Sequence, residues 1–198
     1  MDMRCNTGAV LLTVFFACYD GATMADEILL IDDRRTGDLE STLGPRWRLV
    51  TDGVMGGVSN GNLAVDSVAG KPCLRLRGNV RLENNGGFIQ GALAIEDSDA
   101  ADASDYQGLL LEVYGNNEQY NLHLRTADVW LPWQAYRASF LAPARWHRLK
   151  LPFKEFTGHQ IGKGLDLEHL LRIGIVAIGQ EFSADLCLAK LALYRETD

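Results

Sequence analysis

The sequence lacks the residue patterns that usually hold a metal or a redox centre. It has four cysteines but no Cys-x-x-Cys pair, and none of its four histidines are spaced to bind one metal ion from a single strand or helix. A zinc site and a thioredoxin-type centre are therefore not expected. The sequence predicts no metal and no cofactor.

Positive charge is also scarce. The 198-residue chain has 19 Lys and Arg against 26 Asp and Glu, which gives a net charge of −7. An acidic chain repels a phosphate backbone, so nucleic acid is not an expected partner. Arg75, Arg77 and Arg81 lie close together, but their spacing is typical of the solvent-exposed face of a strand.

Long apolar runs are absent, and no transmembrane segment is expected. The apolar run at residues 9–17 suits the core of a signal peptide, cleaved near Ala25 in an exported or periplasmic protein. Alternatively Met24 is the true start of a cytoplasmic protein, or the first residues form a structured helix. Residues 1–25 are therefore set apart as a signal-like segment or mis-assigned start, and residues 26–198 are expected to form a single β-sandwich domain.

The rest of the chain consists of short segments in which apolar and polar residues alternate. In the segment YNLHLRT, at 120–126, every second residue is apolar, so His123 is expected to face solvent or a groove. Such alternation predicts antiparallel sheets and an all-β sandwich or jelly roll. The strands are expected at 28–31, 47–51, 63–65, 73–77, 88–94, 108–114, 120–126, 136–140, 146–151, 171–177 and 186–194. Only 38–43 and 167–171 have short helical patterns.

Two cysteines lie inside apolar strand-like segments. Cys73 is in PCLRLRG and Cys187 is in DLCLAKL. We expect buried free thiols here, because free cysteine behaves as a small apolar residue. A disulfide is the alternative if the protein is exported.

The glycine-rich segment TDGVMGGVSNGN, at 51–62, contains a match to the Gly-x-Ser-x-Gly motif of serine hydrolases at Ser59. In those enzymes a strand precedes the serine and a helix follows it, whereas here a turn and a strand follow. We therefore expect a structural loop, in which the Asp52 carboxylate accepts backbone hydrogen bonds and fixes the turn.

A second glycine-rich loop, ENNGGF at 83–88, resembles the first in composition. If the two loops lie at the same end of the sandwich, their free N–H groups could hold an anion or a sugar hydroxyl. The segment VWLPWQAY offers a separate candidate surface. It places Trp130, Trp133 and Tyr136 in or beside a loop, where they stack on a sugar or fill the edge of the core.

Several of these segments together resemble one family. WRLVTDGVMGGVS at 47–59, ENNGGF at 83–88, WHRLKLPFKEF at 146–156 and IGI at 173–175 resemble the thirty-kilodalton complex I intermediate-associated proteins. The resemblance implies a galactose-binding-like jelly roll. In mitochondria, members of that family assist the assembly of respiratory complex I, and a chain this short is similar to the bacterial members. The family implies no catalytic residues.

The sequence therefore predicts a non-catalytic binding or assembly module, similar to these assembly factors and chaperones, that holds a protein partner or a small polar ligand. The alternatives are a carbohydrate-binding module and, less favoured, a serine hydrolase at Ser59. The oligomeric state stays open. The predicted ligand-binding residues are Asp52, Gly53, Met55, Gly56, Gly57, Asn84, Asn85, Arg125, Trp130, Trp133 and Tyr136.

Overall fold

The structure is a computed structural model that describes residues 27–196. The predicted signal-like segment or mis-assigned start lies outside these residues. The described chain forms twelve strands: β1 (Glu27–Asp32), β2 (Arg48–Thr51), β3 (Asn60–Val68), β4 (Lys71–Val80), β5 (Phe88–Ala94), β6 (Gly108–Tyr114), β7 (Glu118–Thr126), β8 (Ala135–Ala142), β9 (His147–Pro152), β10 (Thr157–His159), β11 (Leu170–Ile178) and β12 (Phe182–Arg195). Three short 3-10 turns connect them: η1 (Asp52–Met55), η2 (Glu83–Asn85) and η3 (Phe153–Glu155).

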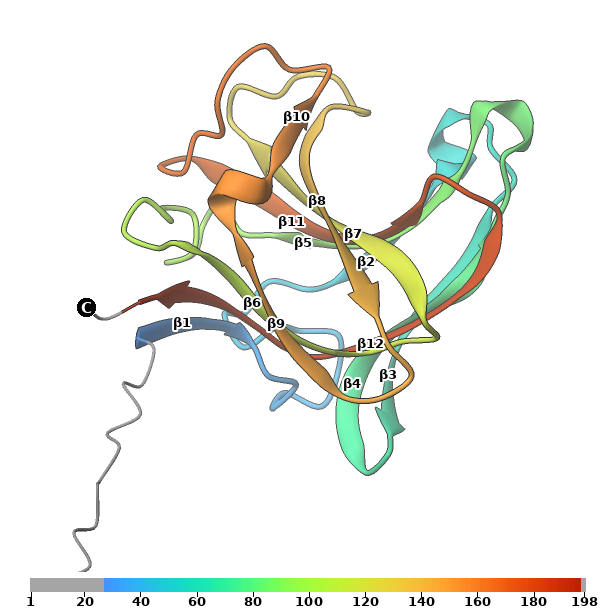
Figure 1. The fold of residues 1–198 in the computed structure, drawn as a ribbon, viewed down its shortest axis with the longest axis horizontal. Helices are drawn as coiled ribbons and strands as arrows, with labels where there is room; N and C mark the ends of the chain where they lie inside the picture. Colours follow the sequence, from blue (N-terminus) through green and yellow to red (C-terminus); the bar gives the residue numbers. More distant parts are fainter. Residues whose placement is uncertain (1–26, 197–198) are drawn as a thin grey trace, which may run out of the picture.

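The strands form two antiparallel sheets that pack face to face (Figure 1). One sheet, here called the groove sheet, has the strand order β10-β8-β7-β11-β5-β2. The other, here called the back sheet, has the order β3-β4-β12-β6-β9, with β1 also paired to β12. The structure therefore confirms the predicted antiparallel β-sandwich, and each predicted strand lies within or overlaps an observed one.

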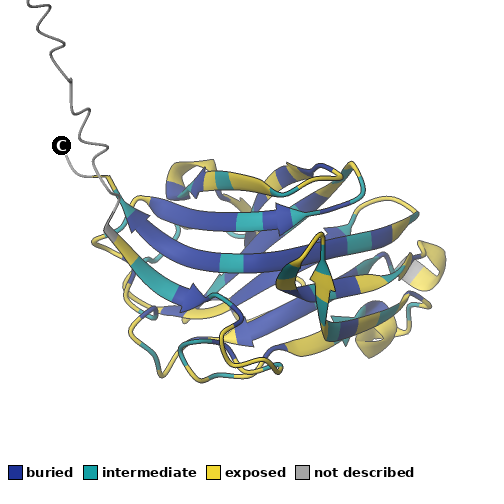
Figure 2. Cartoon of the chain, turned by 90° about the horizontal axis from the view of Figure 1, so that it is seen from below, coloured by how far each residue is buried: buried dark blue, intermediate teal, exposed yellow. Residues whose placement is uncertain are grey.

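The core fills the space between the sheets because the strands alternate as the sequence predicts. On β7, Tyr120, Leu122 and Leu124 are fully buried, while Asn121 and Arg125 lie on the opposite face. Figure 2 shows that burial is concentrated along the central strands and exposure along loops and edges. The side chains at alternate positions of the groove sheet are thus left on its outer face, where they can form a site.

The two buried cysteines are joined. Cys73 on β4 and Cys187 on β12 form a disulfide, with Cα atoms 5.4 Å apart. The expectation of two free thiols is therefore wrong. The sequence could not show that β4 and β12 are hydrogen-bonded neighbours, and that adjacency is what brings the two side chains within bonding distance.

Neither of the two short helical patterns forms a helix. Residues 38–43 form a turn that is closed by a bridge between Glu40 and Arg46. In 167–171 the backbone bonds to a distant segment instead: the Ala103 N–H donates to Leu167, and the Leu170 N–H donates to Ala101. Long-range pairing therefore overrides a weak local preference. Among residues 27–196, no helix is long and apolar enough to cross a membrane.

Candidate functional site

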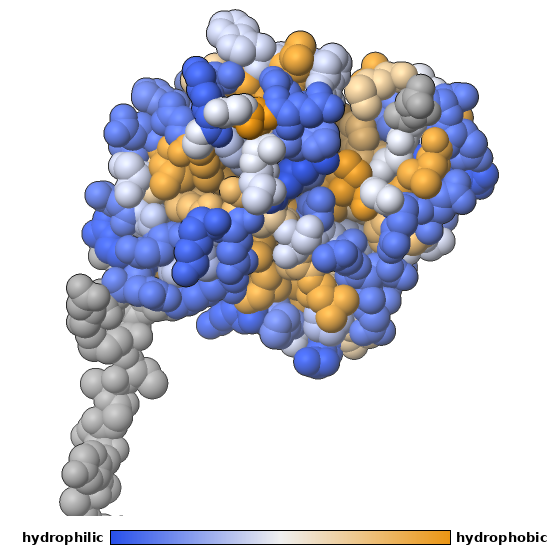
Figure 3. Space-filling view, turned by 45° about the horizontal axis from the view of Figure 1, so that its top comes forward, coloured by the Kyte–Doolittle hydropathy of each residue, from blue (hydrophilic) through white to orange (hydrophobic). Residues whose placement is uncertain are grey.

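A groove of about 520 Å³ opens on the outer face of the groove sheet. It lies between two raised sets of loops, one around η1 and η2 and the other at the ends of β8 and β10 (Figure 1). In Figure 3, apolar side chains are visible between these loops, with polar side chains beside them. The groove therefore combines an apolar lining with polar groups, as ligand-binding pockets do.

One row of residues across four hydrogen-bonded strands underlies the groove at Gly174, His123 and Arg137 and continues beyond it to Ala92. Ala92 on β5 pairs with Gly174 on β11, which pairs with His123 on β7, which in turn pairs with Arg137 on β8. Gly174 has no side chain, so the floor is low at this point. A Cβ atom on Gly174 would overlap the amide of Gln90, which lies across that position.

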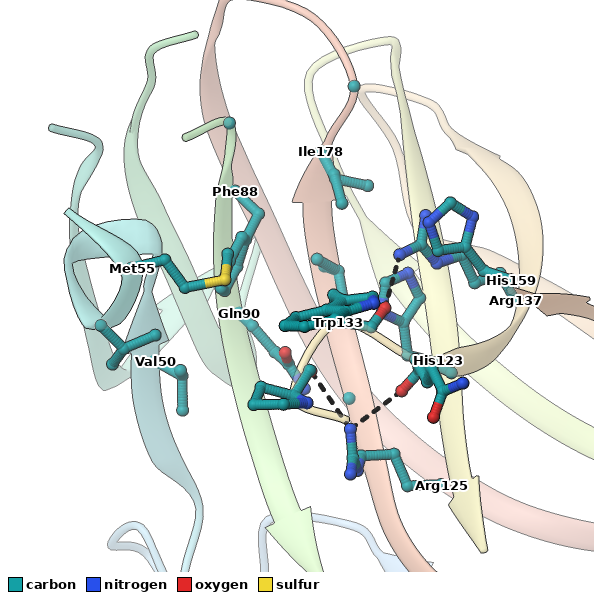
Figure 4. Close-up of a pocket in the computed structure, with 18 of the residues that line it drawn as sticks. Val50, Met55, Phe88, Gln90, His123, Arg125, Trp133, Arg137, His159 and Ile178 are labelled. Carbon is teal, nitrogen blue, oxygen red and sulfur yellow. Dashed lines mark hydrogen bonds between the residues drawn. The ribbon is translucent and has the colours of Figure 1, made fainter. Parts of the chain in front are cut away.

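The two walls of the groove differ in chemistry (Figure 4). Val50, Met55 and Phe88 line one side, while His123 and Arg137 lie on the other, and Trp133 lies between the two groups. No Asp or Glu is present among the described residues that line the groove. A ligand in this groove would therefore contact both apolar surface and hydrogen-bond donors.

Two nitrogens beside the groove have no hydrogen-bond partner. They are Nε2 of His123 and Nε of Arg137, and both atoms are buried. Only 8% of His123 is exposed. Its burial, together with nearby Arg137 and His159, lowers the pKa of His123 to about 3, so the ring is neutral at physiological pH. Buried polar atoms are almost always hydrogen-bonded, so an unmet pair beside a groove indicates a place for a ligand.

Arg125 holds the loop that carries the two tryptophans. Its guanidinium donates to the backbone carbonyls of Val129, Leu131, Pro132 and Gln134, over distances of 2.9 to 3.1 Å. Burial lowers the pKa of Arg125, and the neighbouring Arg172 lowers it further. The side chain therefore acts mainly as a clamp that fixes the loop over the groove.

The tryptophans on this loop are unusually exposed. Trp130 is 85% exposed and Trp133 is 45% exposed. The indole N–H of Trp133 donates to Gln160 at 2.9 Å, and the Gln134 amide donates to the Gln160 carbonyl at 2.7 Å. The loop is therefore tied both to its own strand and to the β10–β11 connection, with its aromatic rings at the groove.

The two glycine-rich loops meet around Asp52. Its carboxylate accepts hydrogen bonds from the hydroxyl and the N–H of Ser59, from the Gly87 N–H at 2.6 Å and from the Phe88 N–H at 3.3 Å. A Cβ atom on Gly57 or Gly86 would overlap the Asp52 side chain. These two glycines make room for the carboxylate, which joins the loops as the sequence predicts for the first of them.

The charge of Asp52 is stabilised by these contacts. Burial favours the neutral acid, but the hydrogen bonds from Ser59, Gly87 and Phe88 outweigh it and lower the pKa of Asp52. Asp52 is fully buried. Its acceptor sites are therefore occupied within the protein, and the side chain braces the end of the groove without facing it.

The structure brings together only some of the predicted ligand-binding residues. Met55, Arg125, Trp130 and Trp133 line the groove. Tyr136 is buried, and its hydroxyl donates to the Gly164 carbonyl at 2.8 Å, so its ring belongs to the core. The remaining predicted residues are not among those that line the groove: Asp52, Gly53, Gly56, Gly57, Asn84 and Asn85.

Several groove residues were missed by the sequence analysis. Gln90, Arg137, His159 and Arg172 come from four different strands and line one site. Their alternation indicates that they point away from the core, but nothing in the sequence shows which strands are neighbours. For His123, the alternation does predict the face on which it lies.

Ser59 does not resemble an activated nucleophile. Its hydroxyl bonds to Asp52 and to the backbone of Arg81, and the residue is buried. None of its hydrogen-bond partners within the described chain is a histidine, which a serine nucleophile normally needs as a base. Within the same residues, no cluster of three His, Cys, Asp or Glu side chains could hold a metal ion.

Comparison with solved structures identifies carbohydrate-binding modules of the same fold. The family 11 module of the cellulosomal cellulase Lic26A-Cel5E of Clostridium thermocellum aligns with a TM-score of 0.66 at 12% identity, over 85% of this chain and 95% of that one. The same family in complex with a β-1,3-1,4-mixed-linked tetrasaccharide gives a TM-score of 0.64 at 11% identity, over 85% and 94%. A family 30 module gives 0.60 at 14% identity, over 89% and 90%. At these identities the likeness concerns the fold.

Comparison of sequences gives one assignment. No curated protein matches the chain. A family model described as Complex I intermediate-associated protein 30 matches residues 38–186, which include both glycine-rich loops and all the residues that line the groove.

Proposed function

The chain belongs to the complex I intermediate-associated protein 30 family, and from this premise we propose that it is a non-catalytic binding module whose groove holds a saccharide. The family match confirms the resemblance drawn from the sequence. The proposal places the ligand across the row of Ala92, Gly174, His123 and Arg137. One face of the ligand would lie on the tryptophan loop.

The observation that carries this proposal is the unmet pair of nitrogens beside two exposed tryptophans. A sugar ring offers hydroxyls that can accept from Arg137 and bond to the neutral ring of His123. Its C–H face can pack on Trp133, which is amphipathic and already held in position. A saccharide would therefore supply both kinds of contact that the groove offers.

The solved structures support the same class of ligand. The fold is shared with the family 11 module seen in complex with a tetrasaccharide. Fold alone does not assign a function, so the support comes from the agreement between that fold and the lining of this groove.

The test is a binding panel with a matched pair of variants. Mono- to tetrasaccharides are screened by thermal shift, since a ligand at about 100 times its dissociation constant adds roughly 2.7 kcal/mol of stability. Hits are measured by titration calorimetry with Trp133→Ala and, as control, Leu141→Ala, an exposed residue on the outward side of β8 that does not line the groove. We expect Trp133→Ala to weaken binding about tenfold to a hundredfold, which is about 1.4 to 2.8 kcal/mol. A panel without any hit would refute the proposal.

A protein partner is the second candidate, and an exposed apolar patch that includes part of one groove wall favours it. Val54, Met55, Val58 and Leu82 are exposed apolar residues near the two glycine-rich loops. Exposed apolar residues that lie together mark interaction sites more often than isolated ones do. If a partner binds there, Val58→Ser, the one of these four residues that does not line the groove, should weaken its capture and leave saccharide binding intact. Loss of both would place the partner in the groove instead.

Of the two predicted localisations, we propose the exported one. The Cys73–Cys187 disulfide would persist in an oxidising compartment and would be reduced in the cytosol. Alkylation of the native protein before and after reduction, followed by mass spectrometry, tests this. Free thiols at both positions in protein from its own cell would instead favour the cytoplasm and a start at Met24.

A further inference from the structure

The groove continues into a second hollow on the same sheet. This hollow, of about 610 Å³, shares Val50 and Arg172 with the groove and extends towards Arg46 and Arg48. Together they form one trough, which we call the arginine trough. It crosses β8, β7, β11, β5 and β2. A trough of this shape suits an extended chain better than a single small molecule.

The length of the trough follows from the sheet itself. The row that begins at Arg137 on β8 continues through His123, Gly174 and Ala92 to Arg48 on β2. Strands in a sheet lie about 4.8 Å apart, so the Cα atoms of Arg48 and Arg137 are about 19 Å apart. Several sugar rings fit over this distance, with an arginine at each end.

The charge of the trough is opposite to that of the whole protein. The chain has a net charge of −7, yet the trough is lined by five arginines and a single acid, Glu96: these arginines are Arg46, Arg48, Arg125, Arg137 and Arg172. Such a local excess of one sign attracts ligands of the other sign.

Two of these arginines are free to bind. Arg48 and Arg172 are exposed, and neither side chain forms a hydrogen bond or an ion pair within the described part of the chain. Arg125 is occupied by four backbone carbonyls. Arg46 lies 3.8 Å from Asp38. The free donors are therefore found along the middle and one end of the trough.

On the outer face of the back sheet, by contrast, arginines form ion pairs with acidic side chains. There Arg75 bonds to Asp185 at 2.7 Å and to Asp66 at 2.8 Å, and Arg77 lies 3.5 Å from Asp185. Charges on that face neutralise each other. The absence of such partners for Arg48 and Arg172 is thus a local property of the trough.

We propose that the arginine trough binds an acidic saccharide chain, whose sugar rings bear carboxylate or sulfate groups. This inference rests on the proposed function and narrows its ligand class. The guanidinium groups of Arg48 and Arg172 would each bind an acidic group through two parallel hydrogen bonds. The neutral contacts at His123 and Trp133 would hold a ring between them.

A nucleic acid fits the same trough less well. Single-strand binding normally uses several aromatic side chains on which successive bases stack, whereas the exposed indoles here lie on one loop at one end.

The experiment compares oligosaccharides that differ only in their acidic groups. The full chain is titrated with tetramers of galactose, glucose and mannose, with the corresponding uronic acid tetramers, and with sulfated tetramers. We expect one acidic form to bind at least tenfold tighter than its neutral counterpart and to weaken as salt rises. The carboxylated and sulfated series identify which acidic group is recognised.

Arginine variants then identify which side chains cause the preference for the acidic tetramer. We expect Arg172→Gln and Arg48→Gln each to weaken the acidic tetramer about tenfold and to leave the melting temperature unchanged. Arg48 does not line the groove itself, so its variant should also leave the neutral tetramer unchanged. Arg145→Gln is the matched control, since Arg145 is equally exposed but lies outside the trough. A loss that is as large in the control would overturn the assignment.

Three outcomes would overturn this inference, and they differ in what they mean for the proposed function. Equal affinity for the acidic and neutral tetramers would overturn the inference and leave saccharide binding in place. Failure of every tetramer would overturn both. Tighter binding of an oligothymidylate than of any acidic tetramer would also overturn the inference, because the trough would then recognise a nucleic acid backbone.

Discussion

Two buried polar clusters lie beside the groove, one around Asp52 and one around His123 and Arg137. They differ in whether all their polar atoms are hydrogen-bonded. Around Asp52, the carboxylate accepts from both loops and is fully used. Around His123 and Arg137, two buried nitrogens are left without partners. A complete cluster contributes stability, because removing any part leaves buried groups unpaired. An incomplete cluster lowers the stability of the free protein, and a ligand that pairs with its unmet nitrogens binds more favourably.

The largest expected effect comes from breaking the complete cluster. Asp52→Ala leaves the donors of Ser59, Gly87 and Phe88 without an acceptor, so we expect a loss of roughly 3–5 kcal/mol of unfolding free energy. Urea denaturation measures it, with Asp66→Ala, an exposed ion-pair partner of Arg75, as a control that should change by less than about 1 kcal/mol. Saccharide affinity of the folded fraction should not change. A large loss of affinity with normal stability would assign Asp52 to the ligand.

The incomplete cluster should respond in the opposite direction. His123→Leu replaces an unmet buried nitrogen by an apolar group of similar size, so we expect a gain of about 1–2 kcal/mol in unfolding free energy. Affinity for the saccharide should fall about tenfold, which is about 1.4 kcal/mol. Denaturation and calorimetry on the same sample separate the two effects. If stability and affinity both fell, His123 would be a packing residue.

The pH dependence of stability gives a third way to separate the clusters. The pKa of His123 is lowered to about 3 in the folded protein by burial, and then by Arg137 and His159, against about 6.5 for an unfolded histidine. Between these values the unfolded chain binds the extra proton, so stability falls as pH falls, by about 1.4 kcal/mol per pH unit. Denaturation at pH 6, 5.5, 5 and 4.5 should show this slope.

The His123→Leu variant is the control for that slope. The stability of this variant should depend much less on pH than that of the unmodified protein. A smaller slope of the same sign should remain from His159, whose pKa is also lowered by burial and by Arg137. The depressed pKa of Asp52 acts only at lower pH, where its stabilisation is lost as the carboxylate is protonated. An unchanged slope in the variant would mean that His123 is charged in the folded protein.

The smallest expected effect concerns Tyr136, which lies under the groove. Tyr136→Phe removes the hydroxyl that donates to the Gly164 carbonyl at 2.8 Å and lies 3.4 Å from the Lys163 carbonyl, so we expect a loss of about 1 kcal/mol in unfolding free energy. Saccharide affinity should stay within twofold, because the buried ring does not face the groove. Calorimetry checks this. A tenfold loss of affinity would instead mean that the Tyr136 hydroxyl takes part in ligand binding.

The sequence predicts the strands well because each carries its own two-residue period. The short strand β10 was missed, since Thr157, Gly158 and His159 are too few to show a period. The loop at Asp52 was also predictable, as its glycines and its acid are close in sequence. The second half of that cluster, at Gly86 and Gly87, was recognised as a glycine-rich loop from its composition, but the sequence does not show that its N–H groups bond to Asp52.

The groove was much less predictable, for a physical reason. Its row of Ala92, Gly174, His123 and Arg137 depends on which strands are neighbours, and β5, β11, β7 and β8 are not in sequence order. The same limit hid the Cys73–Cys187 disulfide. Trp130 and Trp133 were found because a single short loop carries both.

The clamp formed by Arg125 has a consequence for the speed of binding. One guanidinium fixes four carbonyls of the tryptophan loop, so the loop is already ordered before any ligand arrives. Association then needs no slow rearrangement of the loop. We therefore expect a bimolecular association rate constant of about 10⁵ to 10⁷ M⁻¹s⁻¹ or faster. Differences in affinity among ligands would then arise in how long each one stays bound.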